Sequence, residues 1–131
     1  MAVAVLSGGA VVALLDPADR HHDAAVRVLS EADVDEFLLP SSSLAECLVA
    51  PCRVGSEDAL IDALADAGIG VVPVTAEIAI LAARLRARAT GVRLSDALVI
   101  ATAEDLGAML LAVEPGWATI SDQVRPITTL W

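Results

Sequence analysis

The 131-residue chain has few aromatic residues, no lysine and no long uninterrupted apolar segment. Aromatic side chains make up 2% of the residues although hydrophobic residues make up 56%, so Ala, Val, Leu and Ile have to build the core. No stretch approaches the roughly 18 uncharged apolar residues that a membrane span needs. The mean hydropathy of +0.70 therefore indicates a well-buried soluble fold or a sizeable partner interface, and the length indicates one domain over residues 1–131.

Basic residues are scarce. All eight of them are arginines, and the formal net charge is -10. This balance excludes a broadly basic surface of the kind that binds nucleic acid through its phosphates. It leaves open a binding mode in which metal ions and a few local arginines contact the nucleic acid.

Cysteines are also few, and Cys47 and Cys52 stand five residues apart. On one helix this is a poor spacing for a disulfide or a zinc pair. We interpret both as core-packing residues, which fits a reducing, cytoplasmic location. A secretory signal would need a basic segment and a small-residue cleavage site. Residues 1–15 contain neither Lys nor Arg, and no A-x-A site precedes Asp16, so we expect no signal peptide.

Short apolar runs alternate with amphipathic segments along the chain. We expect strands at residues 2–6, 37–39, 71–74, 109–113 and 127–130. We expect helices at residues 9–15, 19–32, 56–67 and 75–90, and two more that start at Ser43 and Ser95. Apolar strands separated by helices predict an α/β fold whose parallel sheet is covered on both faces. Pro73 predicts that the third strand lies at an edge of this sheet.

Ligands bind outside the carboxyl ends of the strands in such a sheet. The segments expected to meet there are the Ser7-Gly8-Gly9 turn, residues 40–43 and Glu114. The glycine turn matches neither the G-x-G-x-x-G pattern nor a P-loop, because no Gly-Lys-Ser/Thr follows it. We interpret it as a tight strand-to-helix turn that needs small residues rather than as a phosphate-binding loop.

Two acids stand near the start of largely apolar helices. Glu46 follows Ser43 at capping-box spacing and Asp96 follows Ser95 in a first turn, so each has an interpretation as part of a helix cap. Together with Glu114 they form a set of carboxylates that would repel one another without a cation. Such oxygen ligands suit Mg²⁺ or Mn²⁺. The set would therefore support metal-assisted phosphodiester hydrolysis.

Two further polar clusters are candidates. His21 and His22 are adjacent and point about 100° apart on a helix, so we interpret them as part of a solvated helix start and not as one site. The segment RLRARATGVRLSD concentrates four arginines just before Asp96, namely Arg84, Arg86, Arg88 and Arg93. They fit either a solvated helix end or a phosphate-contacting patch beside an acidic metal site, and the sequence leaves both open.

Nearly the whole chain resembles the PIN-domain ribonucleases, in particular the VapC toxins of bacterial toxin–antitoxin pairs. The most specific segment is RLSDALVIATAEDLGAMLLAVE, which is similar to the family's L-x-D-A-x-I-x-A-x-A segment, with its acid at Asp96 and a further acid at Glu114. LPSSSLAECLV resembles the family's second strand and the helix that carries a glutamate, here Glu46. VAVLSGGAVVALLDPADRHHDAA resembles the first strand, the first helix and the polar turn that follows.

The resemblance implies a three-layer α/β/α sandwich with a mostly parallel sheet of about four or five strands. It implies Mg²⁺-dependent cleavage of RNA, with Mn²⁺ as a substitute, a homodimer, and inhibition by a small VapB-like antitoxin. The catalytic and metal-binding residues that it implies are Glu46, Asp96 and Glu114. Of the arginines, Arg84, Arg88 or Arg93 would contact the RNA backbone.

The chain departs from the family's pattern at several positions. Ser7 and Gly9 stand where the family has Asp and Ser or Thr, Glu114 stands where it has Asp, and Ala112 stands where it has Thr. Serine is a neutral, weak ligand, so Ser7 as a degenerate metal position predicts weaker metal binding and reduced activity. The alternatives are a non-catalytic PIN-like protein that acts by binding antitoxin or RNA, and a generic α/β nucleotide-binding domain, for which no phosphate-loop motif is present.

Overall fold

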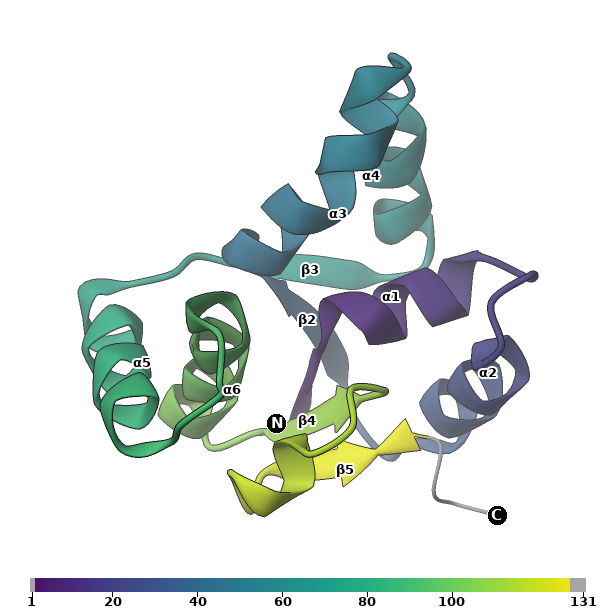
Figure 1. The fold of residues 1–131 in the computed structure, drawn as a ribbon. Coiled ribbons are helices and arrows are strands. Elements are labelled where there is room, and N and C mark those ends of the chain that lie inside the picture. The colour runs from purple at the N-terminus through teal and green to yellow at the C-terminus, as the bar shows by residue number, and fades with distance from the viewer. Residues whose placement is uncertain (1, 128–131) are drawn as a thin grey trace.

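The computed structural model describes residues 2–127, in which a parallel sheet carries helices on both faces (Figure 1). Its five strands run in the order β3-β2-β1-β4-β5, and every neighbouring pair is parallel. The strands are β1 (Val3–Leu6), β2 (Glu36–Pro40), β3 (Ile69–Val72), β4 (Met109–Ala112) and β5 (Val124–Pro126). The helices are α1 (Gly8–Leu15), α2 (His22–Glu31), α3 (Ser41–Arg53), α4 (Glu57–Asp66), α5 (Ala76–Arg88) and α6 (Leu94–Leu106). This architecture confirms the predicted α/β/α sandwich.

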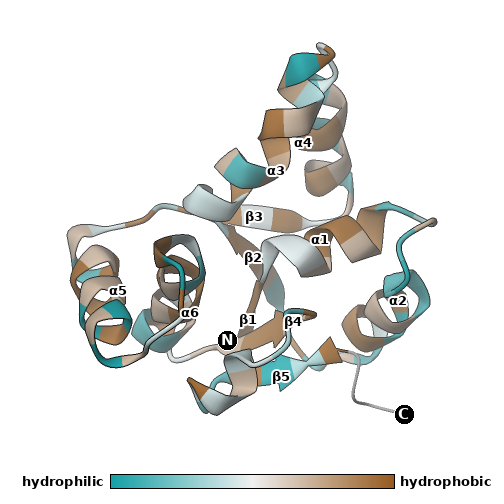
Figure 2. Ribbon diagram, in the orientation of Figure 1, coloured by the Kyte–Doolittle hydropathy of each residue, from teal (hydrophilic) through white to brown (hydrophobic). Residues whose placement is uncertain are grey.

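Alternate residues of β1 face opposite sides of the sheet, as the pleat of a strand requires. Val5 packs in a cluster with residues of α5 and α6, whereas Ala4 and Leu6 pack with residues of α1 and α2. Hydrophobic residues accordingly run along the central strands and the helix faces beside them (Figure 2). Because helices cover both faces, the strands are continuous apolar runs rather than alternating ones, and this is the pattern that predicted them.

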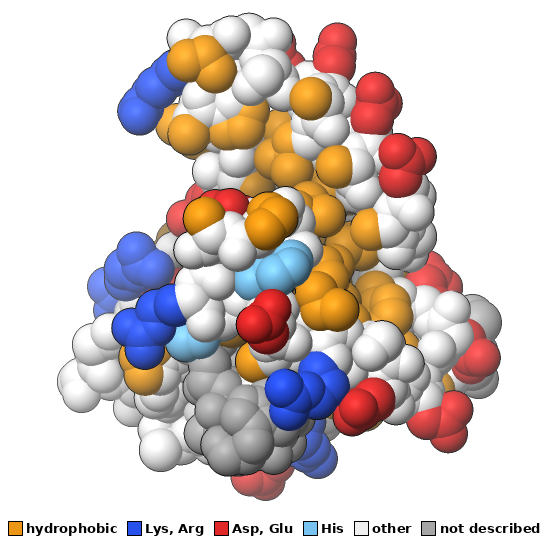
Figure 3. Space-filling view, turned by 90° about the vertical axis from the view of Figure 1, so that its right-hand side faces the viewer, with side chains coloured by type: hydrophobic (Ala, Val, Ile, Leu, Met, Phe, Trp, Pro, Cys, Tyr) orange, Lys and Arg blue, Asp and Glu red, His pale blue; other side chains and the backbone are white. Residues whose placement is uncertain are grey.

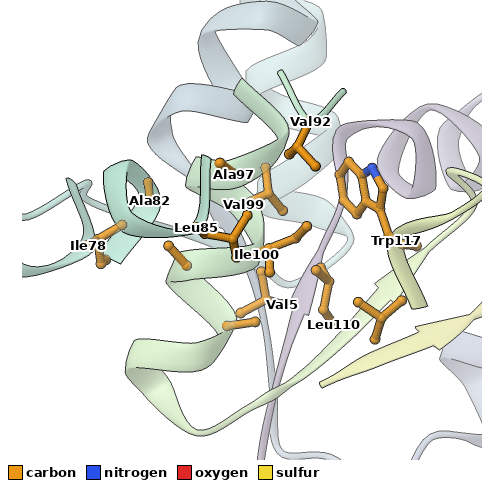
Figure 4. Close-up of a cluster of buried hydrophobic side chains, with 14 of the residues drawn as sticks. Val5, Ile78, Ala82, Leu85, Val92, Ala97, Val99, Ile100, Leu110 and Trp117 are labelled. Atoms are coloured by element: carbon orange, nitrogen blue, oxygen red, sulfur yellow. The ribbon is translucent and has the colours of Figure 1, made fainter. Parts of the chain in front are cut away.

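Helix α6 is apolar around most of its circumference because it packs against both the sheet and α5. Its buried residues are Ala97, Val99, Ile100, Ala101, Thr102 and Ala103. Figure 4 shows side chains from α5, α6, β1 and β4 pointing toward one another in this part of the core. Within residues 2–127, no helix combines the length and the apolarity that crossing a bilayer would require.

The two edge strands differ in how well they were predicted. β3 lies at an edge of the sheet, as Pro73 predicted, although the strand starts at Ile69. The fifth strand was predicted at residues 127–130, but β5 is Val124–Pro126 and pairs with β4. Residues 128–130 lie outside the described part of the chain. The displacement arises because a short 3-10 helix, Trp117–Thr119, brings the chain back to the sheet earlier than the apolar run suggests.

The two serine caps predicted at Ser43 and Ser95 are wrong. α3 starts at Ser41 directly after Pro40, whose φ of -59° already suits a helix start, and Ser43 lies buried inside the first turn. α6 starts at Leu94, with Arg93 at the capping position and no side-chain cap. In contrast, the helix predicted to begin at Thr75 does so, and Thr75 caps α5 by accepting a hydrogen bond from the Ile78 N–H at 3.2 Å.

Replacement of Ile100 tests the packing of α6 between the sheet and α5. Its side chain is 0% exposed, so Ile100→Ala is expected to lower the free energy of unfolding by about 2–5 kcal/mol through lost burial and a residual cavity. Ile80 on α5 is 52% exposed and serves as the matched control, with an expected change of about 0.5 kcal/mol or less. Urea unfolding measures both, and similar losses for the two variants would contradict this packing.

Candidate active site

A cleft of about 240 Å³ opens where β1 and β4 end, beside the first turns of α1 and α6 and the first two turns of α3. β2 lies on one side of β1 and β4 on the other, so the strand order reverses at this point. Open α/β sheets bind their ligands at such a position. The residues that line the cleft are Gly8, Gly9, Val12, Ser43, Glu46, Cys47, Arg93, Ser95, Asp96, Val99, Glu114 and Trp117.

Three acids from distant parts of the sequence line this cleft together. Glu46 comes from the second turn of α3, Asp96 from the first turn of α6, and Glu114 follows β4 by two residues. The structure thus brings the three predicted site acids to one place. Their surroundings differ, and each carboxylate has a different set of neighbours.

The carboxylate of Glu114 is held by two backbone N–H groups. Gly9 donates to Oε2 at 3.1 Å, and Val113 donates to Oε1 at 3.0 Å. Gly9 is the second residue of α1, so the Glu114 charge lies where the helix presents unpaired N–H groups and the positive end of its dipole. These contacts fix the carboxylate at the wall of the cleft.

The carboxylate of Asp96 forms an ion pair with Arg93. The guanidinium donates from Nε to Oδ2 at 3.2 Å and from Nη2 to Oδ1 at 3.0 Å. The hydrogen bond to Asp96 and the charge of that carboxylate raise the pKa of Arg93. The Arg93 side chain is 73% exposed, so this pair adds little stability and can open at small cost.

Glu46 is exposed, and within residues 2–127 no hydrogen bond or ion pair to its carboxylate is formed. Its side chain can therefore turn toward a ligand without breaking a contact. Counted over the lining residues, three carboxylates and one guanidinium leave two negative charges in the cleft. A divalent cation would balance this charge.

Ser7 does not line the cleft. It is 0% exposed, and its hydroxyl accepts a hydrogen bond from the Ala10 N–H at 3.1 Å, which makes it the cap of α1. Its own N–H donates to the Leu111 carbonyl at 3.0 Å. Gly8 and Gly9 present the wall of the cleft instead. They are the first two residues of α1 and neither has a positive φ, so the chain passes from β1 into α1 without the predicted glycine turn.

The remaining predicted polar residues divide between the cleft and the outer surface. Arg93 lines the cleft, whereas Arg84 and Arg88 are exposed on α5 and do not. His22 donates from Nδ1 to the Ala13 carbonyl at 2.7 Å, which ties the start of α2 to α1 away from the cleft. This contact gives His22 a structural role, and both histidines are partly buried at the helix start rather than fully solvated.

The prediction that both cysteines pack in the core is wrong. Cys52 is exposed, and Cys47 is half-buried in the wall of the cleft. Burial, followed by the charges of Glu46 and Glu114, raises the pKa of the Cys47 thiol, so it is a neutral side chain beside the acids. Ser43, one helical turn before Glu46, also lines the cleft, and its buried hydroxyl has no hydrogen-bond partner among residues 2–127. Ser43 stands three residues before Glu46 and four before Cys47, and this spacing on one side of a helix is the signal that could have identified both.

The chemistry of the donor set fits a hard divalent cation such as Mg²⁺ or Mn²⁺, which prefers carboxylate oxygens. The geometry is open rather than closed. In the described part of the chain, no three His, Cys, Asp or Glu side chains are already grouped closely enough to enclose a metal ion. Arg93 holds both oxygens of Asp96, so a cation bound there would compete with the guanidinium for this carboxylate.

The model of the PIN domain family matches residues 5–121, which include both glycines of the first turn and all three acids of the cleft. The chain belongs to this family. No protein among those with curated descriptions matches it in sequence.

Several solved structures share the fold at low sequence identity. A chain of a toxin–antitoxin complex from Klebsiella pneumoniae superposes with a TM-score of 0.77 at 18% identity, covering 95% of this chain and 97% of that one. FitAcB from Neisseria gonorrhoeae gives 0.76 at 17% identity, with 97% and 99% covered. The VapC20 toxin of Mycobacterium tuberculosis, described as cleaving the sarcin–ricin loop, gives 0.71 at 19% identity, with 88% and 93% covered.

Replacement of Ser7 tests its assignment as the cap of α1. Ser7→Ala leaves the Ala10 N–H without its acceptor and is expected to lower the free energy of unfolding by about 0.5–2 kcal/mol. Ser56 occupies the same position before α4 but makes no side-chain cap, so Ser56→Ala is the matched control and should change stability by about 0.5 kcal/mol or less. Equal effects in urea unfolding would contradict the capping role.

Proposed function

We propose that the chain is a Mg²⁺-dependent ribonuclease of the VapC toxin type, with activity weakened by the serine at position 7. The observation that carries the proposal is the meeting of Glu46, Asp96 and Glu114 in one cleft at the carboxyl ends of β1 and β4. Membership of the PIN domain family, and a fold shared with a toxin described as cleaving the sarcin–ricin loop, support RNA as the substrate.

Each acid would contribute in its own way. Glu114 offers a carboxylate already fixed by two backbone N–H groups, Asp96 offers one that Arg93 releases, and Glu46 offers one free to turn inward. These residues would hold Mg²⁺ or Mn²⁺ directly or through water. When bound, the ion would supply an activated water and stabilise the leaving oxygen of the phosphodiester.

Arg93 would change partner when RNA binds. Its guanidinium lies at the cleft, exposed, and a phosphate is a better bidentate partner for it than a carboxylate already needed by a cation. Arg84 and Arg88 lie one turn apart on the exposed face of α5 and would contact the RNA backbone further from the cleft. The backbone contacts would position the substrate without reading its sequence.

Reduced activity follows from the position of Ser7. The residue adds no charge to the cleft, and its hydroxyl is engaged with Ala10. With one negative charge fewer than a four-acid site, the cleft attracts a divalent cation less strongly. The metal affinity, and with it the rate at physiological Mg²⁺, should therefore be lower than that of a site with Asp at this position.

A small antitoxin is the partner that we propose. Several structural neighbours are toxin–antitoxin complexes, and a second, apolar cleft of about 300 Å³ lies between α1 and the α3–α4 pair. Its lining is almost entirely hydrophobic: Val11, Val12, Leu15, Cys47, Ala50, Pro51 and Leu60, with Asp16 at one end. Figure 3 shows hydrophobic side chains gathered in a band on this side of the molecule.

We further propose that the protein forms a homodimer and acts in the cytoplasm.

A non-catalytic role is the second candidate, and two observations favour it. The first strand ends in a buried serine rather than an acid, and Arg93 engages both oxygens of Asp96. Such a protein would keep the fold and bind antitoxin or RNA without cleaving it.

Neutral replacements in the cleft test the catalytic assignment. Glu46→Gln and Asp96→Asn each remove one oxygen ligand charge, so divalent-dependent RNA cleavage should fall by more than the roughly 10- to 100-fold that outer partners of a metal site contribute. Asp105→Asn, at the exposed end of the same helix as Asp96, is the matched control and should cleave normally. Unchanged rates in the two cleft variants would show that the assignment is wrong.

Restoration of an acid at position 7 separates the two candidates. Aspartate caps helices as well as serine does, so Ser7→Asp should keep α1 capped while adding a charge beside the cleft. Mg²⁺ affinity and cleavage rate should both rise. Ser7→Asn, which can cap but is neutral, is the control and should show neither gain. Background activity and no Mg²⁺ binding in Ser7→Asp would instead support the non-catalytic role.

A further inference from the structure

Glu114 reaches across the cleft edge to the start of α1 and fills the space above Gly9. A Cβ atom built on Gly9 would lie 2.7 Å from Glu114 Oε2 and 2.7 Å from Val113 Cγ2, distances that real Cβ atoms do not adopt. A Cβ atom on Gly8 would meet Cys47 Sγ at 3.6 Å, an ordinary contact. The two neighbouring glycines therefore differ sharply in what surrounds them.

The backbone does not explain why position 9 is a glycine. The glycines with positive φ are Gly55, Gly68, Gly91, Gly107 and Gly116, and Gly9 is a regular residue of α1. Glycine is unfavourable inside a helix compared with alanine. The reason for Gly9 is therefore the approach of Glu114 and its neighbour Val113, and not a turn.

The same contact explains why the acid that follows β4 is a glutamate and not the shorter aspartate. The first turn of α1 contains no acid of its own, and Ser7 at the end of β1 is neutral. A glutamate side chain, one methylene longer than aspartate, reaches the Gly9 N–H and delivers a negative charge to the start of α1. The negative charge at the start of α1 is thus supplied by the residue after β4, because the residue after β1 is neutral.

We propose that Gly9 and Glu114 act as a coupled pair in which β4 supplies, at the start of α1, the carboxylate that the end of β1 lacks. Gly9 is a positioning residue: it contributes the N–H that holds Glu114 Oε2 and the space that the side chain needs. The pair itself is a property of the folded chain. Its contribution to cation binding rests on the proposed function.

A metal-free measurement tests the contact. The Gly9 amide proton should shift in the ¹H–¹⁵N spectrum of Glu114→Ala, because its carboxylate acceptor is removed. Glu46→Ala removes an acid of the same cleft that does not contact Gly9 and should leave that resonance in place. A Gly9 resonance that responds equally to both variants would overturn the contact.

A double-mutant cycle tests the coupling. Gly9→Ala should lower the melting temperature, whereas Gly8→Ala should leave it unchanged or raise it. Glu114→Asp withdraws the carboxylate, so it should lower the melting temperature of the otherwise unmodified chain more than that of the Gly9→Ala variant, in which it also relieves one of the two short contacts. Equal effects in both backgrounds would overturn the pair.

Mn²⁺ binding tests the consequence for the site. It is measured as the loss of the free-ion signal in electron paramagnetic resonance spectra. Gly9→Ala should weaken Mn²⁺ binding by roughly 10- to 100-fold, the cost of removing a residue that orients a metal ligand, and Gly8→Ala should retain it. Equal affinities in these two variants would overturn the positioning role. Absence of Mn²⁺ binding by the unmodified chain would contradict the proposed function, while the amide shift and the melting temperatures would still decide the pair.

Discussion

The parallel pairing of β1 with β4 is the constraint on which the site depends. Leu6 pairs with Leu111, and the Ser7 N–H continues the ladder to the Leu111 carbonyl at 3.0 Å. This register places the start of α1 against the residues that follow β4. Both strands are buried on both faces, so a shift of one residue would exchange the two apolar clusters and is strongly disfavoured. The contact between Gly9 and Glu114 is a consequence of this register.

The electrostatics of the cleft follow from that arrangement. Helix α1 presents unpaired N–H groups at the cleft, and Glu114 uses one of them, while Arg93 partly neutralises Asp96 at the start of α6. Glu46 remains without a hydrogen-bonding partner within the described residues. The cleft is thus negative, and two of its three carboxylates, those of Asp96 and Glu114, are individually held by the protein. This explains how a set of acids can be assembled in a chain whose first strand contributes none.

The sequence predicted much of the fold because its strands are continuous apolar runs. Two single residues also had a clear local effect: Thr75 starts and caps a helix, and Pro73 favours an edge strand. It predicted less well where two local signals compete. Ser43 carries a capping pattern, but the proline before α3 starts the helix two residues earlier, so the serine is buried instead. β5 is displaced because a short 3-10 helix shortens the path back to the sheet.

The three acids could be predicted as neighbours, since the sheet rule brings strand ends and helix starts together, but their contacts could not. The i,i+3 spacing of Arg93 and Asp96 permits an ion pair but does not show that both oxygens are engaged, and nothing in the sequence shows that Glu114 approaches Gly9. The most direct test of the account is anomalous diffraction from crystals soaked in Mn²⁺. The account predicts one peak among Glu46, Asp96 and Glu114, with Arg93 turned away from Asp96. A cleft without a peak at saturating Mn²⁺, with Arg93 still paired to Asp96, would contradict it.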